Sequence, residues 1–274
     1  MDPSKTVVVA VGDSITVGAT CNTWKGGYVK VLADLLEAAH PGKYDVRDCG
    51  VCGTDAVRTG HGNLRHRSYW TEANHNDSLA MKPDVVIFML GTNDADEWGP
   101  CANSSVHCGN TKAYYEQDWT DMVNGYISLP NKPAVHTMIP PPYYLPHGFH
   151  GNWTCPATCP AFTDNETVPA VPSDGSDLSP DLIEDFASVD AALGQRGAPA
   201  GNKEAAKACV IDCILPKLVP KLTAAVGLAP PVSLFEFFGG VDSKNSTLMP
   251  GLHPDCNGYI AIAHYLAKQL FSSS

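Results

Sequence analysis

The stretch TVVVAVGDS, residues 6–14, places an unbroken run of apolar and mostly β-branched residues directly before a glycine and two small polar residues. Such a run, with no alternation of polar and apolar positions, predicts a strand buried on both faces, as in a parallel sheet covered by helices. In open α/β sheets, ligands bind beyond the carboxyl ends of the strands. Ser14 therefore occupies a position suited to a nucleophile, although Gly-Asp-Ser is also typical of an ordinary turn.

Segments of strand character alternate with segments of helical character along most of the chain. The expected strands are residues 6–11, 44–46, 84–90, 134–139 and 232–235, and the expected helices are residues 27–39, 114–129, 203–226 (kinked or split at Pro216 and Pro220) and 259–271. This alternation predicts an α/β fold with a parallel sheet covered on both faces.

Residues 147–202 interrupt the alternation. They are rich in Pro, Ser, Gly and Asp and contain the close pair Cys155 and Cys159. Irregular loops of this length are uncommon unless they are functional. We interpret the segment as an insertion over one face of a single domain spanning residues 1–274, with one short helix near residues 180–193.

The charge balance excludes several classes of partner. The 274 residues include 18 Lys and Arg against 29 Asp and Glu, a formal net charge of −11. An acidic surface repels phosphate groups, so we expect no nucleic-acid partner and no binding to anionic membranes. No apolar run approaches the roughly 18 residues of a membrane span. The oligomeric state is left open.

The cysteines and glycosylation motifs indicate a secreted protein or one in the lumen of the secretory pathway. The ten cysteines are an even number, as expected for a set of disulfides in an oxidising compartment. Five N-x-S/T motifs begin at Asn76, Asn103, Asn152, Asn165 and Asn245. The chain starts Met-Asp-Pro-Ser-Lys without a signal peptide, which we interpret as a mature form with an added Met. The alternative is a cytosolic protein with many free thiols.

Three further motifs lie at expected strand ends or a helix start. Gly53 closes the motif GVCG (residues 50–53), where glycines let a backbone N–H approach an oxyanion. Asn93, in LGTND (residues 90–94), brings a side-chain amide suited to the same task. His253, in GLHP (residues 251–254), precedes the last helix and is a candidate general base. Each motif taken singly also has an ordinary explanation. GVCG is compatible with a simple turn, Asn93 with an Asn that caps a turn, and His253 with a structural or solvated His.

The chain resembles the SGNH hydrolases, also called the GDSL esterase and lipase family. The resemblance rests on four motifs in a fixed order: GDS, GxxG, GTND and a terminal HP. The resemblance extends from Val7 to about Leu270, with only the middle insertion outside it. It implies a three-layer α/β/α sandwich with a five-stranded parallel sheet, in agreement with the number of expected strands. It also implies a serine esterase that needs neither a metal nor an organic cofactor.

The resemblance assigns roles to individual residues. Ser14 would be the nucleophile and His253 the base. The oxyanion hole would consist of the N–H groups of Ser14 and Gly53 and the side-chain amide of Asn93. Asp13 and Asp94 would have supporting roles beside these groups.

One position departs from the family pattern. The family usually has Asp three residues before the His, whereas this chain has Pro250. A carboxylate at that position orients the imidazole and stabilises its charged form. Three interpretations remain: a backbone carbonyl near Pro250 leaves a working Ser–His dyad, Asp255 or Asp242 supplies a carboxylate from another direction, or the protein is weakened or inactive. We favour the dyad because Ser14, Gly53, Asn93 and His253 are all present.

Several other residues are candidate sites. The pairs His61/His66 and His147/His150 lack Cys or carboxylate partners at zinc-like spacing, so no metal is expected. Cys49 and Cys52 are expected in a structural disulfide, with each other or with other cysteines. Proximity suggests further disulfides joining Cys101 to Cys108 and Cys155 to Cys159. Trp24, Trp98 and Trp153 are candidates for stacking on sugar rings, with ordinary packing as the alternative.

The sequence as a whole predicts a serine esterase that removes short acyl groups, acetyl above all, from carbohydrates. A short-chain lipid esterase or general carboxylesterase, and a catalytically weakened relative that binds glycans, are the alternatives. A cytosolic thioesterase is a third.

Overall fold

The computed structural model describes residues 4–19, 27–61, 66–96, 112–143, 207, 210–240, 248–249 and 251–272. Five strands form one sheet in the order β2-β1-β5-β6-β7, and every pairing is parallel. The strands are β1 (Thr6–Gly12), β2 (Tyr44–Gly50), β5 (Val85–Met89), β6 (Ala134–Ile139) and β7 (Val232–Ser233). The predicted α/β fold with a five-stranded parallel sheet is confirmed.

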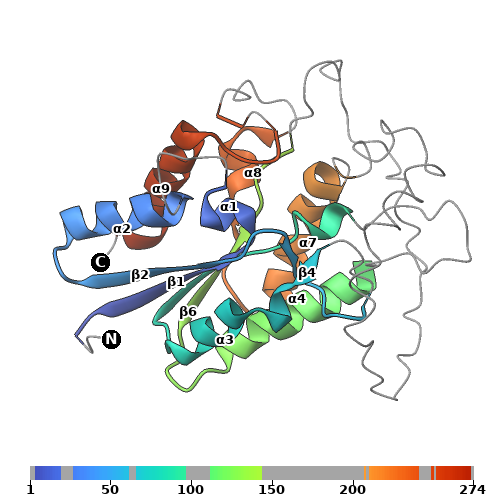
Figure 1. The fold of residues 1–274 in the computed structure, drawn as a ribbon, viewed down its shortest axis with the longest axis horizontal. Coiled ribbons are helices and arrows are strands. Elements are labelled where there is room, and N and C mark those ends of the chain that lie inside the picture. Colours follow the sequence, from blue (N-terminus) through green and yellow to red (C-terminus); the bar gives the residue numbers. More distant parts are fainter. Residues whose placement is uncertain are drawn as a thin grey trace, which may run out of the picture.

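Helices cover the two faces of the sheet (Figure 1). On one face lie α2 (Gly27–Ala39), the four-residue α8 (Leu234–Phe237) and α9 (Cys256–Phe271), and on the other lie α3 (Ala73–Ala80), α4 (Lys112–Ile127) and α7 (Leu215–Ala225). The single-turn α1 (Ser14–Val17) begins two residues after β1 ends, and the 3-10 turn η2 (Asp94–Asp96) begins five residues after the end of β5. A π-helical turn, η4 (Val210–Ile214), leads into α7. A small two-stranded sheet, β3 (Thr54–Asp55) and β4 (Arg67–Ser68), precedes the 3-10 turn η1 (Tyr69–Thr71).

The apolar run of β1 supplies both hydrophobic cores. Successive side chains of a strand point to opposite faces of the sheet. Val7, Val9 and Val11 therefore pack with α4 and α7, whereas Val8 and Ala10 pack with α2 and α9. All five are buried, which explains why no polar residue interrupts the run.

Some expected boundaries were wrong. Residues 234–235 are helical rather than strand, because the Ser233 side chain accepts a hydrogen bond from the Glu236 N–H and starts α8. The last helix begins at Cys256 instead of residue 259, because Asp255 caps it. Pro216 lies in the first turn of α7, where its missing N–H costs little, and Pro220 stays inside that helix without splitting it.

One expectation falls on residues that the structure does not describe. The insertion at 147–202 and its helix near 180–193 lie outside the described residues.

Cys49 and Cys52 are both free thiols, so the disulfide expected there was wrong. The thiol of Cys49 is buried in the core at the end of β2, whereas Cys52 is exposed beyond that strand, so the two residues lie in different environments. Within the described part of the chain, no helix is both long and apolar enough to cross a membrane.

Two glycines let α1 lie directly on the ends of the strands. A Cβ on Gly12 would lie 2.2 Å from Thr16 Oγ1 and 2.7 Å from the Met89 carbonyl oxygen. A Cβ on Gly50 would lie 2.9 Å from the Val17 nitrogen. No ordinary contact is this short, so both positions require glycine for α1 to approach the sheet.

We expect Gly12→Ala to lower the free energy of unfolding by about 1–3 kcal/mol, because overpacking at a rigid site forces backbone shifts. Urea denaturation followed by circular dichroism measures this change. The matched control is Gly125→Ala in α4, where an added Cβ meets nothing within 4 Å. We expect the control to be neutral or stabilising by up to about 1 kcal/mol, from the higher helix propensity of Ala. Equal stability of the two variants would contradict this account of Gly12.

Candidate active site

The topology of the sheet brings three of the predicted motifs to one edge. The chain leaves β1 towards β2 on one side, and it leaves β5 towards β6 on the other. Such a reversal of strand order is where doubly wound α/β proteins bind ligands, beyond the carboxyl ends of the strands. Gly12 is in register with Gly50 on one side and Met89 on the other. The motifs containing Ser14, Gly53 and Asn93 therefore follow three adjacent strand ends.

Ser14 is held at the first position of α1. The Asp13 side chain caps this helix by accepting the Ile15 N–H at 2.9 Å, and Gly18, with φ of 84°, ends it after one turn. Ser14 is 9% exposed, and its Oγ lies 2.7 Å from His253 Nε2. This distance is that of a hydrogen bond between a hydroxyl and an imidazole.

His253 reaches Ser14 because the start of α9 is anchored on both sides. The carboxylate of Asp255 accepts the Gly258 N–H at 2.7 Å, and the Asp255 N–H donates to the Leu248 carbonyl at 2.9 Å. On the side of α1, the Tyr259 hydroxyl donates to the Ala19 carbonyl at 2.9 Å. The turn that carries His253 is thus tied to the segment that follows Ser14.

Asp255 was one of the two aspartates considered as a substitute for the usual carboxylate, but its side chain caps α9 instead of contacting His253. Pro250 and Asp242 lie outside the described residues. Within the described residues, no carboxylate forms a hydrogen bond to Nδ1 of His253. The contact to Ser14 accordingly has the form of a Ser–His pair.

Lys207 is a charged residue near this pair that the sequence analysis missed. Its side chain is 93% shielded from solvent, with Nζ 5.7 Å from the centre of the Tyr143 ring. Burial lowers the pKa of His253 below 6.5, and the positive charge of Lys207 lowers it further. Both effects favour the neutral imidazole, which is the form able to accept a proton. Lys207 belongs to no recognisable motif, and only the tertiary structure relates it to His253.

Asn93 and Asp94 connect the end of β5 to the segment that follows Gly53. The Asn93 side-chain amide donates to the Thr54 carbonyl at 2.8 Å. An amide nitrogen has two hydrogens, so this bond orients the group and leaves a second N–H. The fully buried carboxylate of Asp94 accepts the Ala56 N–H, with both oxygens 3.0 Å from that nitrogen. Gly53 itself has φ of 70°, a left-handed conformation that glycine adopts readily.

Asp13 is fully buried beside the serine that it helps to position. Burial raises its pKa to about 6, although the Ile15 N–H, Thr92, Lys207 and His66 act in the opposite direction. The carboxylate is therefore mostly ionised at pH 7 and protonates as the pH falls through about 6. Its place at the N-terminus of α1 is a supporting one.

The remaining candidates fall outside this group. His61 is bonded through Nδ1 to Asp118 at 2.8 Å, so that ring nitrogen has a structural partner. His147, His150, Trp24, Trp98 and Trp153 lie outside the described residues. Among the residues the structure describes, no three His, Cys, Asp or Glu side chains are grouped so as to hold a metal ion.

The arrangement has the parts needed for acyl transfer. A hydroxyl lies within hydrogen-bond distance of a neutral imidazole, which can remove its proton as the oxygen attacks a carbonyl carbon. N–H donors from two other motifs follow adjacent strand ends at the same edge of the sheet. Such donors stabilise the negative charge that develops on the carbonyl oxygen.

Comparison with known proteins agrees with this chemistry. A model of the GDSL-like lipase/acylhydrolase family matches residues 10–172, more than half of the chain. No curated relative matches. Among solved structures, a lipase/acylhydrolase from Enterococcus faecalis has 17% sequence identity and a TM-score of 0.55, over 96% of this chain and 94% of that one.

Two sugar esterases share the same fold. A carbohydrate acetylesterase from Sinorhizobium meliloti has 15% identity and a TM-score of 0.52, over 97% of this chain and 98% of that chain. A catalytic mutant of an acetylxylan esterase from Geobacillus stearothermophilus has 14% identity and a TM-score of 0.52, over 98% and 95%. The family match confirms the resemblance noted in the sequence, and the chain therefore belongs to the GDSL-like lipase/acylhydrolase family of ester hydrolases.

Proposed function

We propose that the protein is a serine esterase that removes acetyl and other short acyl groups from carbohydrates through an acyl-serine intermediate. The observation that carries this proposal is the 2.7 Å contact between Ser14 Oγ and His253 Nε2. The substrates are small esters or acylated glycans.

In the first half of the reaction, Ser14 Oγ attacks the ester carbonyl carbon while its proton passes to His253 Nε2. The N–H groups of Ser14 and Gly53 and the free amide N–H of Asn93 stabilise the oxyanion. The tetrahedral intermediate collapses, the bond to the sugar oxygen breaks, and His253 returns the proton to that oxygen. The acyl group remains as an ester on Ser14.

In the second half, water replaces the sugar. His253 takes a proton from the water as its oxygen attacks the acyl carbon, and then donates that proton to Ser14 Oγ as the acid leaves. We propose that the pair works as a dyad. The Lys207 charge disfavours the imidazolium, which makes protonated His253 a stronger acid towards the departing oxygen.

Similarity to known structures supports acetyl groups on sugars as the substrate class. Two of the proteins with the same fold are esterases of carbohydrates or xylan, and both act on acetyl groups.

We expect turnover of p-nitrophenyl acetate and of acetylated sugars, falling steeply as the acyl chain of the p-nitrophenyl ester lengthens. Ser14→Ala should abolish it, because no other described hydroxyl is bonded to His253. Release of p-nitrophenol and of acetate measures both substrates. Preference for long acyl chains would contradict the acetyl assignment. No turnover on any ester would instead favour a weakened relative that binds glycans, the alternative that the Pro250 departure suggests.

The pH dependence tests the assignment of His253. Because burial and the Lys207 charge lower the pKa of His253 from 6.5, kcat/KM should fall as the pH drops through this lowered pKa. Lys207→Met removes a charge that opposes the imidazolium, so the acid limb should move to higher pH. The control is Lys217→Met, on the exposed face of α7, which should leave the profile unchanged. If the acid limb of the Lys207→Met profile stays at the wild-type pH, the Lys207 charge does not lower the pKa of His253.

We also propose that the protein is secreted or lumenal. Cys213 and Cys256 each take part in a disulfide, which supports an oxidising compartment, and Asn76 is exposed on α3. The free thiols of Cys49 and Cys52 limit the number of disulfides. Denatured, unreduced protein should therefore expose fewer than its ten thiols to a titrating reagent. Reaction of all ten, with no mass lost on enzymatic removal of N-glycans, would favour the cytosolic thioesterase.

A further inference from the structure

The segment that follows Gly53 is buried, and beyond its backbone pairing with β4 at Thr54 and Asp55 it is bonded through side chains. Residues 54–57 have no exposed surface. Besides Asp94 on the Ala56 N–H, the Trp70 indole N–H donates to the Ala56 carbonyl at 3.0 Å, and the Ser68 hydroxyl donates to the Val57 carbonyl. Side chains from other elements therefore set the path of the segment after β3.

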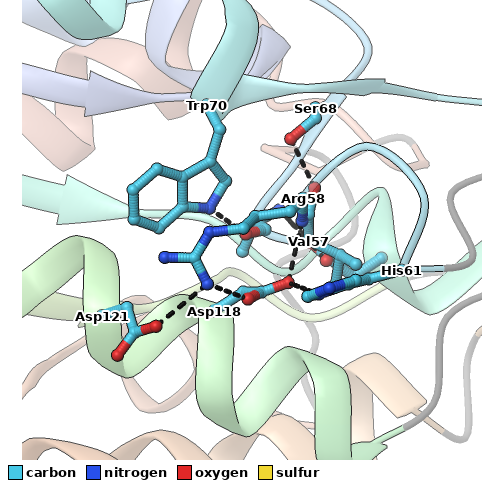
Figure 2. A network of polar contacts seen from close by, with 9 residues as sticks. Val57, Arg58, His61, Ser68, Trp70, Asp118 and Asp121 are labelled. Atoms are coloured by element: carbon cyan, nitrogen blue, oxygen red, sulfur yellow. Dashed lines mark hydrogen bonds and ion pairs between the residues drawn. The ribbon is translucent and has the colours of Figure 1, made fainter. Parts of the chain in front are cut away.

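Asp118 of α4 holds the far end of this segment. Its fully buried carboxylate accepts the backbone N–H of Arg58 at 2.8 Å, the Arg58 guanidinium at 2.5 Å and Nδ1 of His61 at 2.8 Å. Figure 2 shows these three contacts converging on the one carboxylate. The Arg58 guanidinium also lies over the Trp70 ring, 4.0 Å from its centre. Arg58, His61, Trp70 and Asp118 form what we call the Asp118 network.

The same helix also contacts the strand end that leads to Asn93. Tyr115, three residues before Asp118, donates its hydroxyl hydrogen to the Leu90 carbonyl at 3.0 Å. Leu90 follows β5 and directly precedes Gly91-Thr92-Asn93. Neighbouring turns of α4 are thus bonded to both segments that bring oxyanion donors. Because a helix is stiff over one turn, α4 sets the position of one donor segment relative to the other.

We propose that Asp118 and the Trp70 indole N–H are positioning groups of the esterase site. They hold residues 53–58 so that the Gly53 N–H and the Asn93 amide point at the same developing oxyanion. The inference rests on the proposed esterase function and adds two residues outside the family motifs. Neither residue is assigned a contact with substrate. Misplacement of a donor by about 1 Å is enough to lower a rate by about 100-fold.

The test is Asp118→Asn, which keeps the side-chain volume but replaces an acceptor oxygen with a donor. We expect kcat for p-nitrophenyl acetate to fall by about 10- to 100-fold with KM within about twofold, since the lost stabilisation concerns the transition state. The matched control is Asp121→Asn. Asp121 is 44% exposed, and its polar contact among the described residues is to the Arg58 guanidinium. The control should retain kcat within about twofold.

A second readout separates positioning from partial unfolding. An alkylboronic acid forms a tetrahedral adduct on the serine, so its inhibition constant should rise in parallel with the loss of kcat/KM. If only a smaller fraction of the variant were folded, the apparent kcat would fall while the inhibition constant stayed unchanged. That result would overturn the proposal.

Trp70→Phe keeps an aromatic ring at this position but removes the indole N–H together with part of the bicyclic ring, so it tests the proposal if Asp118→Asn does not fold. We expect a loss of kcat of about threefold to tenfold with the same rise in the inhibition constant. Unchanged kcat in the folded Asp118→Asn or Trp70→Phe protein, with an active wild type, contradicts this inference alone. A wild type without turnover contradicts the proposed function and the inference together.

Discussion

The hydrogen bond between Ser14 and His253 joins residues that are 239 positions apart, and the rest of the described structure serves to bring them together. β1 ends at Gly12, where the lack of a side chain lets α1 begin against the sheet. At the other end of the chain, Asp255 starts α9, and Tyr259 ties this helix to Ala19, two residues beyond α1. Each contact is modest by itself, but together they leave the imidazole and the hydroxyl little freedom to separate.

Three buried aspartates perform the same task in different segments of the site. Asp13 accepts the Ile15 N–H, Asp94 the Ala56 N–H and Asp118 the Arg58 N–H. A buried carboxylate is costly unless donors surround it, so each one strongly favours the backbone path that supplies those donors. Loops that would otherwise be mobile are thereby held in place without extended β-ladders. The apolar layers above and below the sheet exclude water from these contacts and strengthen them.

Much of the fold was predictable from the sequence because its signals are local. The helix at 27–39 has its predicted boundaries, and β6 covers residues 134–139 as expected. The spacing of apolar residues, together with Pro and Gly at the ends, specifies such elements with little help from distant parts of the chain. β7 was predicted two residues too long because one side-chain hydrogen bond, from the Glu236 N–H to Ser233, starts α8 inside an apolar stretch. The hydrophobic pattern alone does not distinguish a strand from a short helix at residues 234–235.

The sequence by itself determined the class of fold, the order of the five strands of the main sheet, and four short motifs whose residue types suit acyl transfer, but it did not predict α3 or the small sheet of β3 and β4. It did so because strand and helix periodicity, and the resemblance of those motifs to a family, are properties of neighbouring residues. Only the tertiary structure decided that Lys207 lies near His253, that Asp118 holds the segment after Gly53, and that Cys49 and Cys52 do not pair. These facts depend on the distance between residues far apart along the chain, and packing of the helices on the sheet sets that distance.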